Sequence, residues 1–266
     1  MQTPHLPRCL PVHGYTAIDG TSNAHNAINA GHGVTHVTPG RRLTLVAMST
    51  TLQDPNVANL LDRMYAASKN QMSLLRDRAA EFNRPMTAQE RTDAMSEFYI
   101  PVTPEAGRLL YALVRSTRPT TVVEFGMSFG ISAVHLAAAV RDNGNGRVVT
   151  TELSATKIAA AKETFAEAGL DDVITILEGD ALETLTSLDG PIDFVLLDGW
   201  KDLYLPVLEL LEPRLKTAAL IVADNASAAD LQPYLDRVRN PDNGYVSFNF
   251  LVRDSDSMEI SCRTDN

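Results

Sequence analysis

Two carboxylates, an amide and a lysine stand at the ends of two apolar runs within residues 192–225, IDFVLLDGWKDLYLPVLELLEPRLKTAALIVADN. The first run ends in Asp198, Lys201 opens the amphipathic segment that follows, and the second run ends in Asp224 and Asn225. Carboxylate and amide oxygens are the donors that hard cations such as Mg²⁺ prefer, and zinc is disfavoured because no Cys or His accompanies them. This stretch therefore predicts a divalent-cation site beside a lysine amine.

The two apolar runs and the helical pattern between them indicate neighbouring parallel strands joined by a crossover helix. Adjacent strands lie roughly 4.8 Å apart, so side chains that follow both strands can reach one ligand. Open α/β sheets bind ligands at the carboxyl ends of their strands. We therefore expect the four polar residues to converge at that edge of the sheet.

An earlier stretch of the chain indicates a nucleotide-type site at the same edge. A strand at residues 121–125 leads into Gly126-Met127-Ser128-Phe129-Gly130 and then an alanine-rich helix, so backbone and helix N-terminus can approach a ligand closely. The spacing differs from the G-x-G-x-x-G of dinucleotide enzymes, and alone it is a weak signal. Glu152, at the tip of the next strand (147–151), is placed to accept both hydroxyls of a ribose, although a surface glutamate would look the same.

The third strand of the series, residues 173–178, leads into Gly179, Asp180 and Ala181, a loop that can flank an adenine ring. Asp180 either contacts the adenine amino group or caps the helix that follows. A helix is expected at residues 154–168, between Glu152 and this third strand, and a further helix near residues 231–239. Two strands at residues 245–252 and 258–263 close the chain.

Strands alternate with helices throughout, which predicts one α/β domain: a Rossmann-like, doubly wound, seven-stranded and mainly parallel sheet with a C-terminal antiparallel pair. Three additional helix starts precede the first strand, at Asp54-Pro55, at Thr87 with Glu90 completing a capping box, and at Thr103-Pro104. The first two helices are a candidate lid or homodimer surface, and packing on the sheet is the alternative. His135 is expected to be a packed or surface residue rather than a catalyst.

Composition excludes several other classes of protein. The chain has 266 residues, of which 44% are hydrophobic and 21% charged, and its net charge of −10 disfavours a nucleic-acid grip. Two cysteines form no disulfide framework, and no apolar run reaches membrane-span length, so a cytoplasmic protein is the default expectation. Residues 1–47, which hold five of the six histidines, are expected to be disordered, with Met48 as the natural start and 48–266 as the folded unit.

Five segments together, TVVEFGMSFGISAV, VVTTEL, ILEGDA, FVLLDGWKDLYLP and LIVADN, resemble the class I S-adenosylmethionine-dependent O-methyltransferases of the catechol and caffeoyl-coenzyme A type. The resemblance extends from about Val102 to Asn225 and weakens after that. It implies an enzyme that methylates a small hydroxylated aromatic. Departures at Gly199 and at Ser128, where the catechol enzymes often have an aromatic residue, would widen the pocket and leave the acceptor open.

The resemblance also implies a role for each matching position. Asp198, Asp224 and Asn225 would hold Mg²⁺, and Lys201 would be the general base. Asn225, Trp200, Lys201 and, through a looser match, Glu259 would contact the acceptor. Residues implied in cofactor binding are Val102, Glu124, Gly126, Ser132, Glu152, Gly179, Asp180, Ala181 and Asp198.

Two other functions stay open on the sequence alone. A metal-independent methyltransferase acting on another group would keep the cofactor site and use Asp198 and Asp224 only structurally. A non-catalytic adenosine-ligand binder would recruit a partner through the N-terminal helices. A nicotinamide oxidoreductase is disfavoured by the glycine spacing.

Overall fold

The computed structural model describes residues 50–78, 84–253 and 256–264, so the disorder predicted for residues 1–47 lies outside the described residues. Helices and strands of the described part are, in chain order, α1 (Pro55–Asp77), α2 (Ala88–Ala94), α3 (Pro104–Thr117), β1 (Thr121–Phe125), α4 (Ile131–Asn143), β2 (Arg147–Glu152), α5 (Ala155–Ala168), β3 (Ile174–Glu178), α6 (Ala181–Thr184), β4 (Ile192–Leu197), α7 (Tyr204–Leu211), β5 (Leu215–Ala223), α8 (Gln232–Arg239), β6 (Tyr245–Arg253) and β7 (Asp256–Arg263).

The three predicted helix starts are confirmed by their caps. Asp54 accepts a hydrogen bond from the Asn56 backbone N–H at the start of α1, and Thr103 accepts one from Ala106 at the start of α3. Thr87 and Glu90 form the reciprocal capping box of α2. These caps satisfy backbone N–H groups that have no partner within the helix, which fixes where each helix begins.

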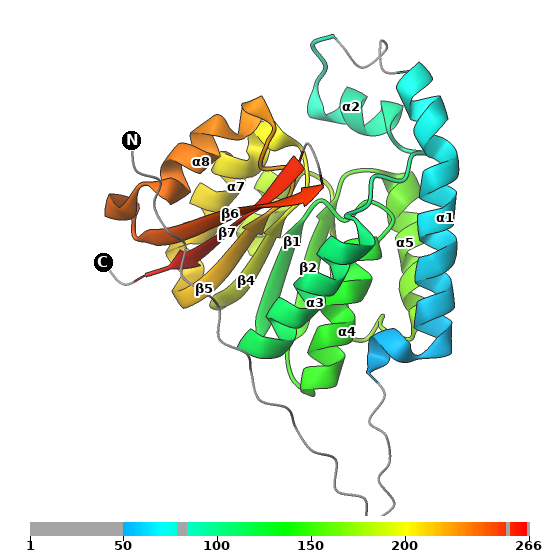
Figure 1. Cartoon of the computed structure of the whole chain (residues 1–266), viewed down its shortest axis with the longest axis horizontal. Coiled ribbons are helices and arrows are strands. Elements are labelled where there is room, and N and C mark those ends of the chain that lie inside the picture. Colours follow the sequence, from blue (N-terminus) through cyan, green and yellow to red (C-terminus); the bar gives the residue numbers. More distant parts are fainter. Residues whose placement is uncertain (1–49, 79–83, 254–255, 265–266) are drawn as a thin grey trace, which may run out of the picture. The chain divides into compact units, whose positions relative to one another are not determined.

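The seven strands form one sheet in the order β3-β2-β1-β4-β5-β7-β6 (Figure 1). Strands β1 to β5 are parallel, and β7 is antiparallel to both β5 and β6, which confirms the predicted fold class. Strands β4 and β5 are neighbours, with Leu197 opposite Ala223. The residues that follow them, Asp198 and Asp224, therefore leave adjacent strand ends side by side.

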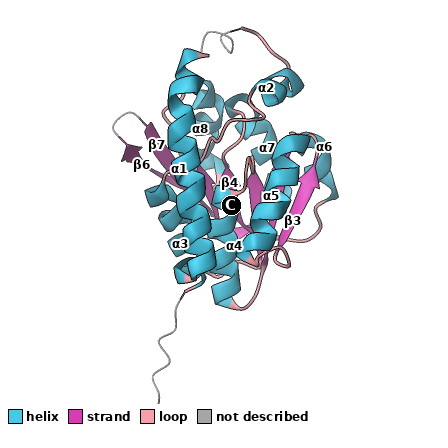
Figure 2. Cartoon of the chain, turned by 90° about the vertical axis from the view of Figure 1, so that its right-hand side faces the viewer, coloured by secondary structure: helices cyan, strands magenta, loops and turns pink. Residues whose placement is uncertain are grey.

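Alternation along the strands divides the core between two faces of the sheet. Val122 packs with residues of α1, α3, α4 and α5, whereas the next residue, Val123, packs with residues of α6, α7 and α8. This period of two is the geometry of a strand buried on both faces. Figure 2 shows the helices on either side of the sheet from a second direction.

The added N-terminal helices have separate places. Helix α1 runs alongside α5, where Arg63 forms an ion pair with Glu167, and its apolar side joins the core (Figure 1). Helix α2 instead supplies residues to a pocket. No described helix has both the length and the apolar character needed to cross a membrane.

His135, in α4, is a packed core residue, as the sequence predicted. Its ring nitrogen Nδ1 lies 2.9 Å from the carbonyl oxygen of Ile131 and donates to it. A Cβ atom at Gly107 of α3 would lie only 2.6 Å from Nε2, so the glycine makes room for the ring. Burial lowers the pKa of His135 to about 4, which keeps the ring neutral.

Candidate active site

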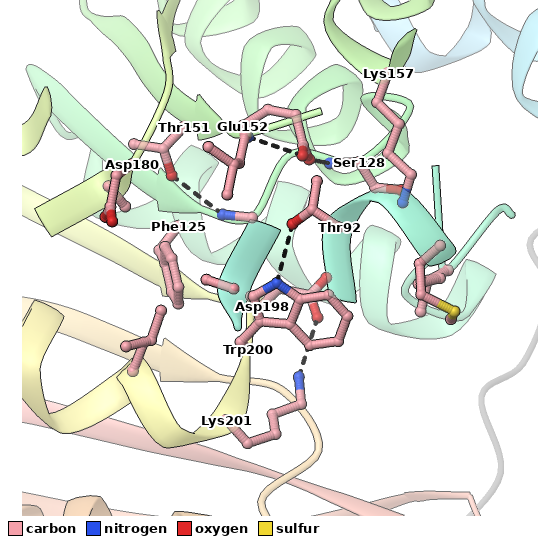
Figure 3. Close-up of a pocket in the computed structure, with 18 of the residues that line it drawn as sticks. Thr92, Phe125, Ser128, Thr151, Glu152, Lys157, Asp180, Asp198, Trp200 and Lys201 are labelled. Carbon is pink, nitrogen blue, oxygen red and sulfur yellow. Dashed lines mark hydrogen bonds and ion pairs between the residues drawn. The ribbon is translucent and has the colours of Figure 1, made fainter. Parts of the chain in front are cut away.

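A pocket opens at the carboxyl ends of the parallel strands, with α2 along its other side (Figure 3). Nine of the residues predicted from the sequence line it: Gly126, Glu152, Gly179, Asp180, Ala181, Asp198, Trp200, Lys201 and Asn225. They come from segments that follow five different strands. The parallel sheet therefore brings together residues that lie up to a hundred positions apart in the chain.

Three predicted cofactor residues lie beside this pocket rather than in its wall. Ser132, near the start of α4, lines a small adjoining pocket together with Tyr99 and Phe129, whose rings are stacked. Val102 packs in the hydrophobic core, while its neighbour Pro101 lines the small pocket. Glu124 is fully buried within β1. The side chain of Val102 is therefore a core contact, and the pocket surface at this point comes from the residues just before it.

Two glycines let the turn after β1 and the loop after β4 come into contact. A Cβ atom at Gly126 would lie 2.6 Å from the Cα of Gly199, and Gly126 has a positive φ of 96°. A Cβ atom at Gly199 would in turn lie 2.5 Å from the Phe125 ring. Gly199 was expected to widen the pocket, but the space beside it is filled by Phe125.

Backbone amides orient the carboxylate of Glu152. Its oxygens accept hydrogen bonds from the N–H groups of Ser128, Leu153 and Ser154, at 2.8 to 2.9 Å. Asp180 accepts a hydrogen bond from Leu182 and so caps α6, while it also lines the pocket. The two interpretations of Asp180, helix cap and pocket residue, are therefore compatible.

Glu124 has one buried carboxylate oxygen that lacks a hydrogen-bond partner among the described residues. The Thr150 hydroxyl donates to Oε2 at 2.5 Å, whereas Oε1 has no hydrogen-bond partner within the described residues. Burial raises the pKa of Glu124 to about 7, against the opposing effect of the Ser132 and Thr150 hydroxyls. A buried acceptor without a donor is costly unless a ligand supplies one, so this oxygen fits the amino group of an amino-acid-bearing cofactor.

The predicted metal ligands meet at the ends of β4 and β5. Asp198, Asp224 and Asn225 line a common cavity, and Lys201 Nζ lies 3.8 Å from Asp198 Oδ1. Burial and the charge of Asp224 raise the pKa of Asp198 well above its ordinary value. Two buried acids so close together repel each other, and a cation between them would relieve that repulsion.

The donor set consists of two carboxylates and one amide. Among the described residues there is no group of three or more His, Cys, Asp or Glu side chains arranged to hold a metal ion, and this set has only two such residues. Oxygen donors alone suit Mg²⁺ better than zinc. Asn225 has a positive φ of 56°, a conformation that asparagine tolerates better than most residues do.

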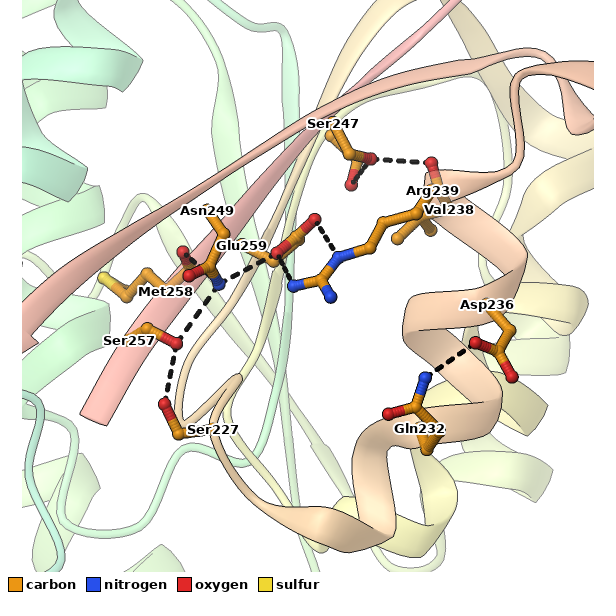
Figure 4. A network of polar contacts seen from close by, with 11 residues as sticks. Ser227, Gln232, Asp236, Val238, Arg239, Ser247, Asn249, Ser257, Met258 and Glu259 are labelled. Carbon is orange, nitrogen blue, oxygen red and sulfur yellow. Dashed lines mark hydrogen bonds and ion pairs between the residues drawn. The ribbon is translucent and has the colours of Figure 1, made fainter. Parts of the chain in front are cut away.

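Glu259, predicted to bind the acceptor, does not face this cavity. Its side chain is 1% exposed and accepts two hydrogen bonds from Arg239 of α8, at 2.9 and 2.7 Å, and a third from Asn249 (Figure 4). It pairs across the ladder with Ala223, one residue before Asp224. The prediction for Glu259 is therefore wrong, because the residue belongs to a polar network between α8 and the C-terminal strands.

Asp256 lies in the place that had been predicted for Glu259. As the first residue of β7, it lines the cavity with Asp198 and Asp224 and accepts a 2.6 Å hydrogen bond from the Asn225 amide. An antiparallel strand begins where its neighbour ends, which places the start of β7 at the end of β5. The sequence contained this aspartate, but the pairing register that selects it depends on the fold.

Helix α2 is held beside the pocket by three contacts to the segment after β4. The Trp200 indole N–H points to the Thr92 hydroxyl at 3.5 Å, as Figure 3 shows. Arg91 stacks on the Trp200 ring, 4.9 Å from its centroid, and forms two 2.9 Å hydrogen bonds with Asp202. Helix α2 is thus connected to the segment that carries Trp200 and Lys201.

Comparisons with known proteins agree with this site. Residues 123–226 match a family model described as a methyltransferase domain. The chain is 31% identical to the catechol O-methyltransferase of Sus scrofa over 140 residues, which cover 50% of this chain and 74% of that protein. It is 30% identical to catechol O-methyltransferase B of Danio rerio over 151 residues, 54% of this chain and 56% of that protein. The chain thus spans little more than half of the zebrafish relative.

A solved structure shows the same fold. An O-methyltransferase from Bacillus cereus, in complex with SAH, superposes with a TM-score of 0.59 at 18% identity, covering 76% of this chain and all of that one. The two strand-end aspartates, Lys201 and the glycine turn all fall within the segment matched by the methyltransferase model. On these comparisons, the chain belongs to the class I S-adenosylmethionine-dependent O-methyltransferases of the catechol O-methyltransferase type.

Proposed function

We propose that this protein transfers a methyl group from S-adenosylmethionine to a hydroxyl group of a small, catechol-like aromatic, assisted by Mg²⁺. Asp198, Asp224 and Asn225 would hold the cation, and Lys201 would be the general base. The observation that carries this proposal is the meeting of these three oxygen donors and one amine at the ends of two adjacent parallel strands.

Residues of the Asp180 loop, Glu152 and the turn after β1 would hold the cofactor. Glu152 is held by three backbone N–H groups, and a carboxylate has lone pairs left for the ribose hydroxyls. Oε1 of Glu124, which lacks a hydrogen-bond partner among the described residues, would accept a hydrogen bond from the amino group of the cofactor.

A bound divalent cation would supply positive charge that stabilises two neighbouring acceptor oxygens and favours loss of a phenol proton. Lys201 takes that proton, since its amine lies next to Asp198 at the pocket wall. Asp256, which lines the same cavity as the proposed metal ligands, would accept a hydrogen bond from the second hydroxyl of the acceptor. Fixed positioning of the methyl donor and the acceptor can lower the barrier by up to about 7 to 11 kcal/mol.

The experiment is a panel of acceptors incubated with labelled S-adenosylmethionine, with Mg²⁺ or with excess chelator, followed by mass measurement of the products. Catechols should be methylated in Mg²⁺, and phenols with a single hydroxyl should be poor acceptors. Lys201→Met should reduce turnover by about 10² to 10⁴, the usual contribution of a general base. Undiminished activity in chelator would instead support a metal-independent methyltransferase, and turnover unaffected by Lys201→Met would exclude this lysine as the base.

A further inference from the structure

Lys157, on the first turn of α5, is a buried lysine in the wall of the candidate pocket. Its side chain is 6% exposed, and its amine lies 5.6 Å from the centre of the Phe129 ring. Within the described part of the chain, this amine forms neither a hydrogen bond nor an ion pair with another residue. Lysine is rarely buried without a charged partner, which indicates that this amine interacts with a ligand.

Ser128 supplies a second unsatisfied polar group to the same pocket. Its hydroxyl is buried and has no hydrogen-bond partner among the described residues, although its backbone N–H donates to Glu152. In Figure 3 the Lys157 side chain descends toward Ser128. Both residues line the pocket, and each carries a donor, one charged and one neutral, that forms no hydrogen bond within the described part of the chain.

The surroundings indicate which ligand would satisfy both donors. Burial lowers the pKa of Lys157, and the nearby charges of Glu152 and Asp198 only partly oppose that effect. An anion in the pocket would restore the charged amine, because it replaces the lost hydration. The acids Glu152 and Asp198 would repel a doubly charged phosphate more strongly than a single negative charge. Two donors match the two oxygens of a carboxylate.

We propose that the Lys157 amine and the Ser128 hydroxyl form a carboxylate-binding subsite of this pocket. The proposal rests on the proposed function, because it assumes that the pocket holds methyl donor and acceptor. Two carboxylates could reach the subsite: that of the amino-acid part of S-adenosylmethionine, and that of an acidic aromatic acceptor. The chemistry is the same in both cases, and the experiment separates the two sources.

Binding without turnover tests the cofactor source. Isothermal titration would compare S-adenosylhomocysteine with 5′-methylthioadenosine, which keeps the nucleoside and lacks the amino-acid carboxylate. Lys157→Met and Ser128→Ala should weaken S-adenosylhomocysteine binding, the former by about 10- to 100-fold, as expected for a charge-assisted hydrogen bond. Binding of 5′-methylthioadenosine should stay within about 3-fold. Equal weakening of both ligands would show that Lys157 contacts the nucleoside and would overturn the proposal.

Acceptor kinetics test the other source. If the carboxylate belongs to the acceptor, Lys157→Met should raise KM for 3,4-dihydroxybenzoate by about 10- to 100-fold and leave KM for its methyl ester unchanged. Lys162→Met is the matched control, because it removes an exposed lysine of the same helix that pairs with Glu178. It should change neither S-adenosylhomocysteine binding nor the KM for 3,4-dihydroxybenzoate. If Lys157→Met changes neither S-adenosylhomocysteine binding nor the KM for 3,4-dihydroxybenzoate, the proposed subsite is refuted. Failure of the unaltered protein to bind S-adenosylhomocysteine would instead contradict the proposed function.

Discussion

The Lys201 amine donates a 2.8 Å hydrogen bond to the Tyr204 hydroxyl, and this hydroxyl donates in turn to the backbone carbonyl oxygen of Asp224 at 3.2 Å. Tyr204 is fully buried at the start of α7, packed edge-on against the rings of Phe125 and Tyr234. The proposed base is therefore connected through one rigid tyrosine to a proposed metal ligand on the neighbouring strand. Tyr204 is a positioning residue in this arrangement.

Replacing Tyr204 by phenylalanine should lower kcat about tenfold and leave the acceptor KM nearly unchanged. The phenylalanine ring fills the same space but cannot accept the hydrogen bond from Lys201, a contact that contributes on the order of 1 kcal/mol. Steady-state kinetics measure kcat and KM separately and so test whether only kcat changes. Tyr234→Phe removes a hydroxyl from the adjacent buried ring, which is not bonded to Lys201, and an equal loss in this control would refute the positioning role.

Asp224→Asn should stabilise the protein in chelator and abolish its stabilisation by Mg²⁺. Asp224 is 4% exposed, and its charge contributes to the raised pKa of Asp198, so a neutral side chain relieves repulsion between two buried acids. The unaltered protein should gain about 2.7 kcal/mol at a cation concentration of about 100 times Kd. Urea unfolding with and without Mg²⁺ measures both effects. The exposed Asp236→Asn is the control, and its response should match that of the unaltered protein.

Arg91→Met should raise the acceptor KM by about 3- to 10-fold, because α2 loses both its ion pair with Asp202 and its stacking contact with Trp200. Half of the Asp202 side chain is exposed, so global stability should change by less than about 1 kcal/mol. Arg63→Met breaks a comparable surface pair between α1 and α5, away from the pocket. A KM change of the same size in both variants would show that the α2 contact has no special role.

Stability should fall as the pH decreases from about 6.5 to 4, in part because of His135. Its pKa in the folded protein is about 4, so in this window the unfolded chain binds a proton that the folded protein does not. The full shift corresponds to about 3 kcal/mol. His135→Asn keeps a donor near the Ile131 carbonyl and cannot titrate. Urea unfolding at several pH values should show a shallower decrease for this variant, whereas identical slopes would contradict the assignment.

Local patterns in the sequence determined most of the elements of this fold. Asp54, Thr87 and Thr103 mark helix starts because a side-chain oxygen can satisfy backbone N–H groups one turn away, and this interaction needs no tertiary contact. The convergence of Asp198 with Asp224 was equally predictable. Parallel neighbours joined by a short crossover end at the same edge of the sheet, so residues after each strand must lie close together.

Long-range contacts decided the rest. Which acidic residue of the last strand faces the cavity depends on the antiparallel register between β5 and β7, and no local pattern sets that register across the 32 positions from Asp224 to Asp256. Side chains alternate between faces, so Glu259 turns toward Arg239 while Asp256 reaches the strand ends. Lys157 likewise has the sequence context of an ordinary helix lysine, and only the folded structure shows that it is buried in the wall of the pocket that Ser128 also lines.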